Sequence, residues 1–470
     1  MKSQLYRAKV SRREILRVGI VGAFLAFERC TLNGRAHAAS VKLIIPPDWL
    51  PRAFDTVRAI QAPCIPSRVV RIAQEDGDTR ELIQSAIEKV SALGGGKISL
   101  APGMWRIRGP LVLRSRTEIH LEEGATLVFS GDRADYLPPV VTRWEGTDLY
   151  GYSPCIYADS VTDIAVTGRG SLQMERGGDI ESWRFEQAEA RRKLRMMGAT
   201  GVPLEQRIFA PQGFLRPSFI QFLRCERTLV QGVKIKEIAF WGVHILYSRH
   251  ATVRAVRIES DRVNNDGVDI DSSSYVLVEG CTFKTGDDCI AIKSGRDYDG
   301  RKVGIPSEHI IIRDCRMERS GSAGIAIGSE MSGGVRYVYI FRCDMGKVQT
   351  VFNIKSNLDR GGFVEGVRVW NISAEECSRL IQVTTSYHGY QGGKIPPRFE
   401  DIEIEDMRCK RAKEGISIRG VPLSPVKRLV LKQLSISHVQ HPSSIAHVEQ
   451  FRCDDVRMNG ELLSCVENES

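Results

Sequence analysis

The chain has 470 residues, of which 42% are hydrophobic and 26% are charged, a globular composition with enough length for a large core. The formal net charge is +9, but residues 1–38 hold eight Lys/Arg and two Asp/Glu, so the remainder carries only +3. This balance, without a basic stripe interleaved with aromatic residues, removes any charge argument for nucleic acid, and we expect no nucleic-acid partner.

Residues 1–38 have the order of a bacterial export signal. A twin arginine, Arg12 and Arg13, precedes the apolar run 18–27, and small residues at 36–38 offer a cleavage site. The apolar run is about half of the ~20 residues that a membrane span needs. We therefore expect twin-arginine export of the folded protein to the periplasm or the medium, with no membrane contact after cleavage. A disordered basic tail is the alternative interpretation.

The next segments predict a linker and then a capped solenoid. Residues 39–67 are interpreted as a linker, and residues 68–470 as one catalytic domain. Asp76–Thr79 offers helix N-caps, apolar residues recur at helical spacing from Leu82 to Leu93, and three glycines at 94–96 end the helix. One amphipathic helix ahead of many strands suits a cap over the first coil, whose edge and interior need covering.

From Gly109 onward, short strands dominate. The exception is 180–206, a predicted surface excursion that is helical around Phe185–Met197 and either walls the binding face or is a solvated decoration. Between 218 and 440, strand pairs recur with a period of 22 to 35 residues, and the extra length is confined to loops. This spacing predicts an all-β fold, a right-handed parallel β-helix with an N-terminal capping helix. A β-sandwich is the rival, but the Asn-Gly and Asp-Gly hairpin turns it needs are scarce.

The cysteines indicate packing, not a disulfide framework. Eleven of the twelve lie beyond residue 38, and an odd number cannot be fully paired. Cys281, Cys315 and Cys343 each precede a matching strand by nine or ten residues, so we expect a row of small buried side chains. No CxxC or Cys/His cluster is present, and we expect no structural zinc.

The stretch 264–295 carries the chemistry. Two strands centred on Asp269 and Ala291 lie 22 residues apart, so one turn of a coil would bring Asp266 beside Asp287 and Asp288. Neighbouring carboxylates can divide into acid and base because their environments separate their pKa values. Each motif alone is also ordinary turn chemistry. Stacking of coils ~4.8 Å apart would line one groove with seven side chains: Asp266, Asp269, Asp287, Asp288, Lys293, Ser322 and Lys355.

At these residues the chain resembles glycoside hydrolase family 28, the polygalacturonases and related pectin hydrolases. The family's Asn-x-Asp-Gly, Gly-Asp-Asp, Gly-His-Gly and Arg-Ile-Lys motifs correspond to 264–267, 286–288, 321–324 and 353–355. Bacterial exo-acting members are similar at 141–146, 292–296 and 328–336 as well. The resemblance covers roughly 70–440.

The resemblance implies inverting hydrolysis of α-1,4 bonds between galacturonic acid units, with no cofactor and no metal. Asp287 would protonate the leaving oxygen, and Asp266 and Asp288 would activate the water. Such inversion usually needs acid and base ~6.5–9.5 Å apart, against ~5–5.5 Å for retention. Substrate-binding candidates complete the site, with Lys355 holding a galacturonate carboxylate: Lys355, Asn264, Lys293, Ser322, Asn353 and Arg360.

Two departures from the family motifs leave the substrate open. The family histidine falls on Ser322 or Ala323, and the fourth-motif arginine is Asn353, which weakens bidentate carboxylate recognition. A hydrolase of a methylated or branched pectin, of rhamnogalacturonan or of xylogalacturonan is therefore an alternative to a polygalacturonase.

Three classes of protein remain distinct hypotheses. The first is an exported pectin hydrolase acting from chain ends, a monomer whose partner is a pectic polysaccharide or oligogalacturonide. The second is a catalytically weakened β-helical carbohydrate-binding protein. The third is a pectate lyase, which would use calcium and an arginine base, and the motifs favour hydrolysis over it. Exo action needs a wall at one end of the groove, which only loops such as 180–206 or 296–306 could supply.

Overall fold

The computed structural model describes residues 46–388, 392–441 and 443–463. The predicted export signal lies outside these residues. The chain divides into residues 1–52 and 53–470, and the architecture below is that of the second unit. Residues 39–67, interpreted as a linker, include a helix that sequence analysis did not anticipate, α2 (Leu50–Ala59). Within the described ranges, every helix is too short or too polar to cross a bilayer.

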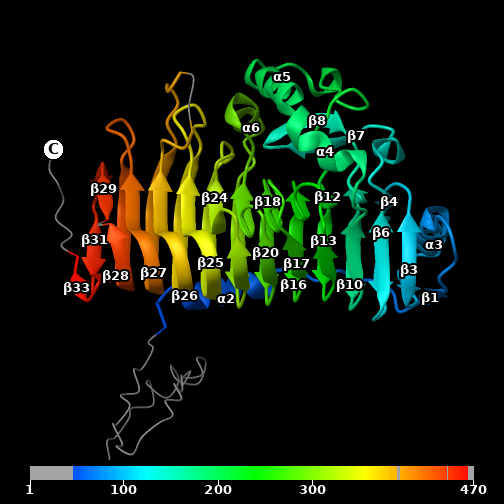
Figure 1. Cartoon of the computed structure of the whole chain (residues 1–470), viewed down its shortest axis with the longest axis horizontal. Coiled ribbons are helices and arrows are strands. Elements are labelled where there is room, and N and C mark those ends of the chain that lie inside the picture. Colours follow the sequence, from blue (N-terminus) through cyan, green and yellow to red (C-terminus); the bar gives the residue numbers. More distant parts are fainter. Residues whose placement is uncertain (1–45, 389–391, 442, 464–470) are drawn as a thin grey trace, which may run out of the picture. The chain divides into compact units, whose positions relative to one another are not determined.

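The described residues of the second unit form a right-handed parallel β-helix, as predicted (Figure 1). Strands far apart in sequence pair in parallel in three ladders, each coil contributing one strand to each ladder. The rival β-sandwich is excluded because its sheets would be antiparallel. The ladder that carries the catalytic candidates contains β12 (Ile220–Leu223), β15 (Val243–Leu246), β18 (Val268–Asp271), β21 (Ile290–Lys293) and β24 (Ala323–Gly328).

The other two ladders complete each coil. The second contains β10 (Thr162–Gly168), β13 (Glu226–Gln231), β16 (Arg249–Arg254), β19 (Ser274–Glu279) and β22 (Ser307–Arg313). The third contains β11 (Ser171–Met174), β14 (Lys234–Lys236), β17 (Arg257–Ser260), β20 (Thr282–Thr285) and β23 (Arg316–Ser320). Later coils run as long bent strands through all three ladders: β25 (Val335–Lys355), β26 (Phe363–Thr384) and β27 (Arg398–Arg419). β28 (Val426–His441) runs through the second and third and reaches only the start of the first, which β29 (Ser444–Ala446) continues.

A helix covers the first coils of the solenoid, and short strands form the last coils. Helix α3 (Arg80–Ala92) buries Ile83, Ile87 and Val90 against the first coils, which confirms the predicted cap. The first coils contain β1 (Val69–Ile72), β2 (Gly96–Leu100), β3 (Gly103–Ile107), β4 (Leu111–Val112), β5 (Thr117–Leu121), β6 (Ala125–Phe129) and β9 (Ile156–Asp159). The last contain β29 (Ser444–Ala446), β30 (Val448–Glu449), β31 (Arg452–Asp454), β32 (Arg457–Met458) and β33 (Glu461–Leu462).

The core is built from rows of apolar side chains that occupy equivalent positions in successive coils. Val253, Val278, Ile312, Ile340, Val369, Ile404 and Leu431 follow one another coil by coil, and all are buried. Alternation along each strand sends the next side chain outward, so the period-two pattern in the sequence becomes a continuous apolar interior. The predicted cysteine row is confirmed: Cys281, Cys315 and Cys343 are each at most 2% exposed in the same core.

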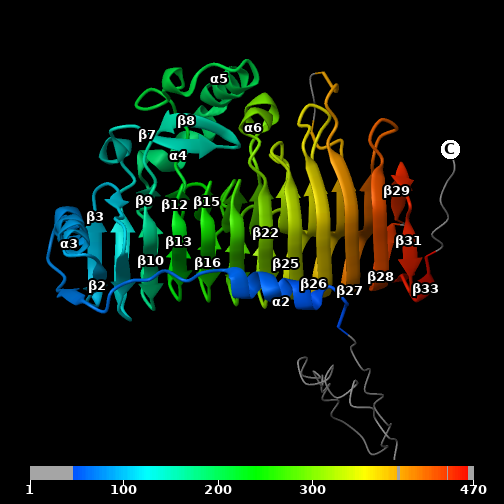
Figure 2. The same ribbon diagram turned by 180° about the vertical axis from the view of Figure 1, so that it is seen from behind.

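The insertions gather along one edge of the solenoid, above the ladder of β12, β15 and β18 (Figures 1 and 2). The predicted excursion forms helices α4 (Asp179–Glu186) and α5 (Ala188–Ala199), followed by the 3₁₀ turns η2 (Leu204–Gln206), with η1 (Arg133–Tyr136) before them. An antiparallel hairpin, β7 (Val140–Trp144) and β8 (Thr147–Gly151), lies beside them. Helix α6 (Asp297–Val303) follows β21.

Candidate active site

Register between β18 and β21 brings the three catalytic candidates together. Asp269 pairs with Ala291 in the parallel ladder, so the turn before β18 lies beside the turn before β21. The backbone N–H of Gly267 donates to the carbonyl of Asp288 at 3.0 Å, which locks the two turns. One carboxylate oxygen each from Asp266, Asp287 and Asp288 lies within 4.8 Å of the others.

The three acids lie close together partly because two of them are adjacent in the sequence. Asp287 and Asp288 follow each other in one turn, and the Asp288 N–H donates to Asp287 Oδ1 at 3.0 Å. The 4.8 Å limit joins nearest oxygens, so it is compatible with the ~6.5–9.5 Å between carboxyl groups that inversion usually needs.

The three carboxylates differ in what holds them. Asp288 Oδ1 accepts from the backbone N–H of Ala323 at 2.8 Å, and Oδ2 accepts from Lys355 Nζ at 2.8 Å. Ser322 hydrogen-bonds the same carboxylate. Although burial raises the pKa of Asp288, the ammonium groups of Lys355 and Lys293 and these hydrogen bonds outweigh it, and the pKa is lowered. Asp288 is therefore an anion at neutral pH.

Asp287 and Asp266 shift in the opposite direction. Burial raises the pKa of Asp287, and the neighbouring charge of Asp288 raises it further. Burial also raises the pKa of Asp266 well above its ordinary value, with added repulsion from Asp269 and Asp287. The site thus holds a proton beside an ionised carboxylate, the division of roles that acid–base catalysis requires.

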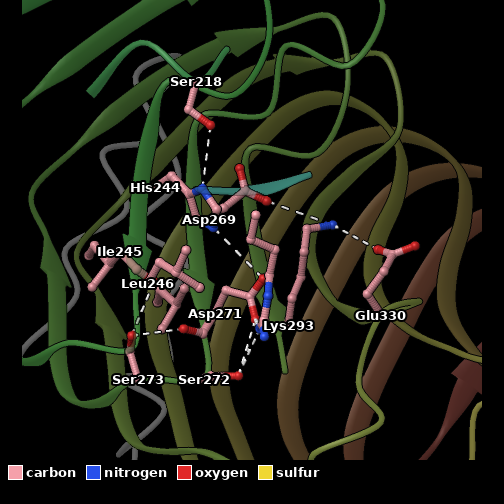
Figure 3. Close-up of polar contacts among 12 residues, drawn as sticks. Ser218, His244, Ile245, Leu246, Asp269, Asp271, Ser272, Ser273, Lys293 and Glu330 are labelled. Atoms are coloured by element: carbon pink, nitrogen blue, oxygen red, sulfur yellow. Dashed lines mark hydrogen bonds and ion pairs between the residues drawn. The ribbon is translucent and has the colours of Figure 1, made fainter. Parts of the chain in front are cut away.

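Lys293 is a second buried lysine of the site, beside Lys355 (Figure 3 shows Lys293). Its Nζ lies 3.4 Å from Glu330, 3.7 Å from Asp269 and 3.8 Å from Asp266. Glu330 is paired also with Arg296, which keeps its pKa well below the ordinary range despite burial. Asp269 has no hydrogen bond to any described residue, is fully buried, and its pKa is raised by that burial.

Beside Asp269 lies a second buried network that joins the β-helix to the β7–β8 hairpin (Figure 3). Asp271, on β18, accepts from Arg143 of the hairpin at 2.7 Å and lies 3.7 Å from His244 Nε2. His244 Nδ1 contacts Ser218 at 3.4 Å and Gln221 at 2.8 Å. Burial lowers the pKa of His244, which is therefore neutral, so this network orients β18 and does not supply a catalytic acid.

A pocket of about 1190 Å³ opens above the carboxylates. Its wall comes from α5, from α6 and from the segment after β26, the first two being the loops that sequence analysis proposed as walls. The lining is mainly charged: Glu145, Arg191, Arg192, Arg195, Met196, Ala199, Thr200, Trp241, Asn264, Asp266, Asp287, Asp288, Lys293, Arg296, Asp297, Tyr298, Arg301, Ser329, Glu330, Lys355, Asn357, Asp359, Arg360, Tyr387, His388, Gly392, Lys394 and Ile395. Cations on this rim suit an anionic ligand.

Most sequence-predicted site residues line this pocket, and three do not. Lys355, Lys293, Asn264 and Arg360 line it with the three catalytic candidates. Asp269, expected in the groove, instead lies buried beneath it. Ser322 and Asn353 are not among the lining residues. Ser322 contacts Asp288 instead, and the side-chain Oδ1 of the buried Asn353 has no hydrogen-bond partner among the described residues.

Sequence reasoning missed the aromatic residues of the pocket. Trp241 lies against Lys293, whose Nζ is 4.8 Å from the ring centroid, and Tyr387 lies 5.2 Å from Lys355 Nζ. Neither stands in a recognisable motif, although Trp241 precedes β15 by the same two residues by which Asp266 precedes β18. Glu330 and Arg296 fall in stretches that resemble the family, but their pairing across coils has no signal in a single sequence.

The three carboxylates also form the one group of acidic or metal-ligating side chains, within the described residues, whose donor atoms converge. Carboxylate oxygens are the ligands that calcium and magnesium prefer. However, Lys355 already donates to Asp288, and Lys293 lies beside Asp266. The cluster is therefore balanced by ammonium groups, and we assign no metal to it.

Comparison with known proteins gives consistent similarities. The sequence profile described as glycosyl hydrolases family 28 matches residues 211–453. A probable polygalacturonase of Vitis vinifera is 24% identical over 382 residues, 79% of this chain and 72% of that protein. An exo-poly-alpha-D-galacturonosidase of Dickeya chrysanthemi is 23% identical over 430 residues, 83% and 70% of the two chains. The structure of a hyperthermoactive exopolygalacturonase from Thermotoga maritima is 33% identical, with a TM-score of 0.83 and coverage of 88% and 96%.

Proposed function

The chain belongs to family 28 of the glycosyl hydrolases, and from that premise we propose that it is an exo-acting hydrolase of α-1,4-galacturonosyl bonds in pectic chains. The observation that carries the proposal is the convergence of Asp266, Asp287 and Asp288 at the base of a pocket with a cationic rim. Galacturonate brings one carboxylate per sugar, and a rim of arginine and lysine side chains is complementary to it.

The three carboxylates take separate roles. Asp287, whose pKa is raised by burial and by Asp288, protonates the leaving glycosidic oxygen. Asp288, kept ionised by Lys355, accepts the proton of the attacking water. Asp266, whose pKa is raised well above its ordinary value by burial, keeps its proton and orients the attacking water for Asp288. Lys355 also stabilises a galacturonate carboxylate that approaches the same edge.

The central test is the variant Asp287→Asn. An asparagine cannot give a proton to the leaving oxygen, so reducing-end release from oligogalacturonides should fall by about 10²–10⁴-fold, the usual contribution of one acid or base. Binding of the oligosaccharide, measured by calorimetry, should persist. If the wild-type protein binds oligogalacturonides without turnover, the chain is a carbohydrate-binding member of the family. An unsaturated product that absorbs in the ultraviolet would indicate a lyase.

The stereochemical outcome is open to direct measurement. We propose inversion, on the strength of the assignment that the family resemblance implies. The nearest oxygens of the three acids lie within 4.8 Å of one another, which is compatible both with the ~6.5–9.5 Å between carboxyl groups of inverting enzymes and with the ~5–5.5 Å of retaining ones. Proton NMR of the fresh product decides between them: the β-anomer appears first if the α-bond is inverted, and the α-anomer first if it is retained.

Exo action is supported by the wall and by the similarity to an exopolygalacturonase. Helix α5 and helix α6 contribute lining residues on one side of the acids, so a long chain cannot pass through unhindered. A hexagalacturonide labelled at its reducing end should lose units of one size from the other end. A ladder of all shorter lengths from the first minutes would contradict the proposal.

A modified pectin is the second candidate substrate. Asn353 stands where the family motif carries arginine, and Ser322 or Ala323 where it carries histidine, so recognition of a plain galacturonate carboxylate has one guanidinium fewer. We therefore propose that oligogalacturonides be compared with methylated, rhamnogalacturonan and xylogalacturonan fragments. A kcat/KM at least tenfold higher for one of these would assign it as the substrate class.

Twin-arginine export also remains a proposal for residues 1–38. Arg12 and Arg13 precede an apolar run of about ten residues, an arrangement typical of such signals. Replacing both arginines with lysine should leave the protein in the cytoplasm of a bacterial host that exports the wild type. Equal export of the two proteins would contradict the assignment.

A further inference from the structure

Arg216 is a buried arginine without an acidic partner. It lies just before β12, is 2% exposed, and has no carboxylate within ion-pair distance in the part of the chain that the structure describes. Burial lowers its pKa to about 10. Removing a guanidinium from water without pairing it is costly, so its hydrogen bonds must compensate for that cost.

Those hydrogen bonds converge on the loops that carry the active site. Nη1 donates to the carbonyls of Ala239 and Val263 at 2.8 and 3.0 Å, which belong to the turns before β15 and β18. Nη2 donates to Asn264 Oδ1 at 2.8 Å. Nε donates to Gln187 Oε1 at 3.1 Å, between helices α4 and α5 of the wall. One guanidinium thus joins two successive coils and the insertion.

The contact with Asn264 fixes the orientation of that amide. A guanidinium can only donate, so it must face the amide oxygen, and the Asn264 NH₂ group is left for the pocket that the residue lines. Asn264 has a φ of 60°, a left-handed conformation that asparagine tolerates but that needs support from its surroundings. Arg216 supplies that support on both sides, through the Val263 carbonyl and the Asn264 side chain.

The same turn sets the place of Asp266. Asn265, fully buried, bonds the Phe240 carbonyl through Nδ2 at 3.1 Å, and the Gly242 N–H donates to the Asp266 carbonyl at 2.9 Å. The turn is therefore held from the core side by Asn265 and from the wall side by Arg216. Arg262, next to this turn, also pairs with Glu181 of α4 at 3.0 Å, but Arg216 is the link to the wall that reaches the Asn264 side chain.

We propose that Arg216 is a positioning residue of the active site: it orients the Asn264 amide with its NH₂ toward substrate and holds the 263–266 turn so that Asp266 meets the Asp287–Asp288 pair. This inference rests on the proposed hydrolase function for its kinetic consequences, but its structural consequence is independent of that function. Arg216 itself does not line the pocket, so it acts through Asn264 and Asp266.

The kinetic test uses Arg216→Gln and Arg216→Lys with oligogalacturonides as substrate. Displacement of a catalytic group by about 1 Å can cost ~10²-fold in rate, so we expect kcat to fall about 10- to 100-fold and KM to change less than about threefold. Arg216→Lys, which keeps a cation with three donors, should recover part of kcat. A rise in KM at unchanged kcat would overturn the positioning role.

A double-mutant cycle tests whether Arg216 acts through Asn264. If it does, Arg216→Gln combined with Asn264→Ala should lower kcat no further than the more severe single variant, because the two residues then form one unit. Multiplication of the two single effects would contradict the inference. Arg227→Gln is the matched control: Arg227 on β13 forms a bidentate pair with Asp163 on β10, in the second ladder, so its loss should lower Tm and leave kcat and KM unchanged.

Crystal structures of Arg216→Gln and Arg216→Lys separate this inference from the proposed function. The expected result is a displaced turn at 263–266 in Arg216→Gln, with the Asn264 amide no longer fixed, and a smaller displacement in Arg216→Lys. An unmoved Asp266 in both variants would overturn the inference whatever the enzyme's substrate. Failure of the wild-type protein to hydrolyse any pectic oligosaccharide would instead count against the proposed function alone.

Discussion

At the scale of single residues, the site separates three identical carboxyl groups by what surrounds each. Asp288 accepts from Lys355 and from a backbone N–H, which lowers its pKa, whereas Asp287 and Asp266 gain burial and repulsion, which raise theirs. An ionised base requires pH above the Asp288 pKa, and a protonated acid requires pH below the Asp287 pKa. A plot of kcat/KM against pH should therefore be bell-shaped. Its acid limb should follow the pKa of Asp288, and its alkaline limb should follow the pKa of Asp287.

Lys355→Met should move the acid limb of that bell to higher pH. The Lys355 ammonium lies 2.8 Å from Asp288 Oδ2 and stabilises the ionised form, so its removal raises the pKa of Asp288. The base then becomes protonated at a pH where the wild-type enzyme is still active. The check is kcat/KM against pH for both proteins. Lys394→Met is the control, because it deletes another cation that lines the pocket. The acid limb of its activity profile should stay where it is in the wild type. An unmoved limb in Lys355→Met would show that Asp288 does not govern it.

Asp269→Asn should be far milder than Asp288→Asn, although both remove a carboxyl group from the same site. Asp269 is fully buried and has no hydrogen bond to the part of the chain that the structure describes. Burial raises its pKa well above the ordinary value although Lys293, shared with Asp266 and Glu330, opposes that shift, so it is protonated at working pH. An asparagine has nearly the same shape and the same zero charge. We expect kcat within about threefold of wild type, against a loss of ~10²–10⁴-fold for the base. Equal losses would mean that Asp269 acts as an anion.

At the scale of elements, buried ion pairs fasten the insertions to the solenoid. Arg143 of the β7–β8 hairpin pairs with Asp271 of β18, and Arg207, after η2, donates twice to Asp299 of α6 at 2.9 and 2.8 Å. Breaking such a buried pair by removing one partner costs ~3–5 kcal/mol. The wall is therefore held in place before substrate arrives, which lowers the entropy lost on binding.

Helix α5 should contribute binding energy and not chemistry. Arg191 and Arg192 line the pocket from α5, with no ion-pair partner among the described residues. Replacing both with glutamine should raise KM for oligogalacturonides severalfold at unchanged kcat, and added salt should narrow the difference because exposed charges are screened. Arg184→Gln, an exposed arginine on α4 that lies over Phe185 and not in the pocket, is the matched control. A fall in kcat at constant KM would place α5 closer to the reaction than proposed.

At the scale of the whole molecule, one register determines both the core and the site. The period that aligns Val278, Ile312 and Ile340 in the interior also sets Asp266 beside Asp288 on the outside, since each coil contributes an equivalent turn. The sequence therefore predicted the β-helix, the capping helix, the cysteine row and the meeting of the three acids from periodicity alone.

The features that sequence analysis did not predict depend on contacts that do not recur from coil to coil. The β7–β8 hairpin, the Glu330–Lys293 pair and the positions of Trp241 and Tyr387 arise where insertions fold back onto the coils. Asp269 was expected in the groove, but it is fully buried beside Lys293, 3.7 Å from its Nζ. Ser322 and Asn353 follow the motif register and still do not line the pocket.

The continuous core predicts where stability can be changed without touching the site. Ile404, on β27, is fully buried between Val369 and Leu431 of the neighbouring coils, so Ile404→Ala should leave a cavity in the apolar row and cost ~2–5 kcal/mol. It does not line the pocket, and kcat and KM should stay at wild-type values below the unfolding transition. Urea denaturation followed by circular dichroism measures the loss.

Leu423→Ala is the control. At a side chain that is 85% exposed, it should change stability by less than about 0.5 kcal/mol. Equal urea midpoints for the two variants would contradict the assignment of this row to the stabilising core. A reduced kcat in fully folded Ile404→Ala would show that the later coils help to position the acids.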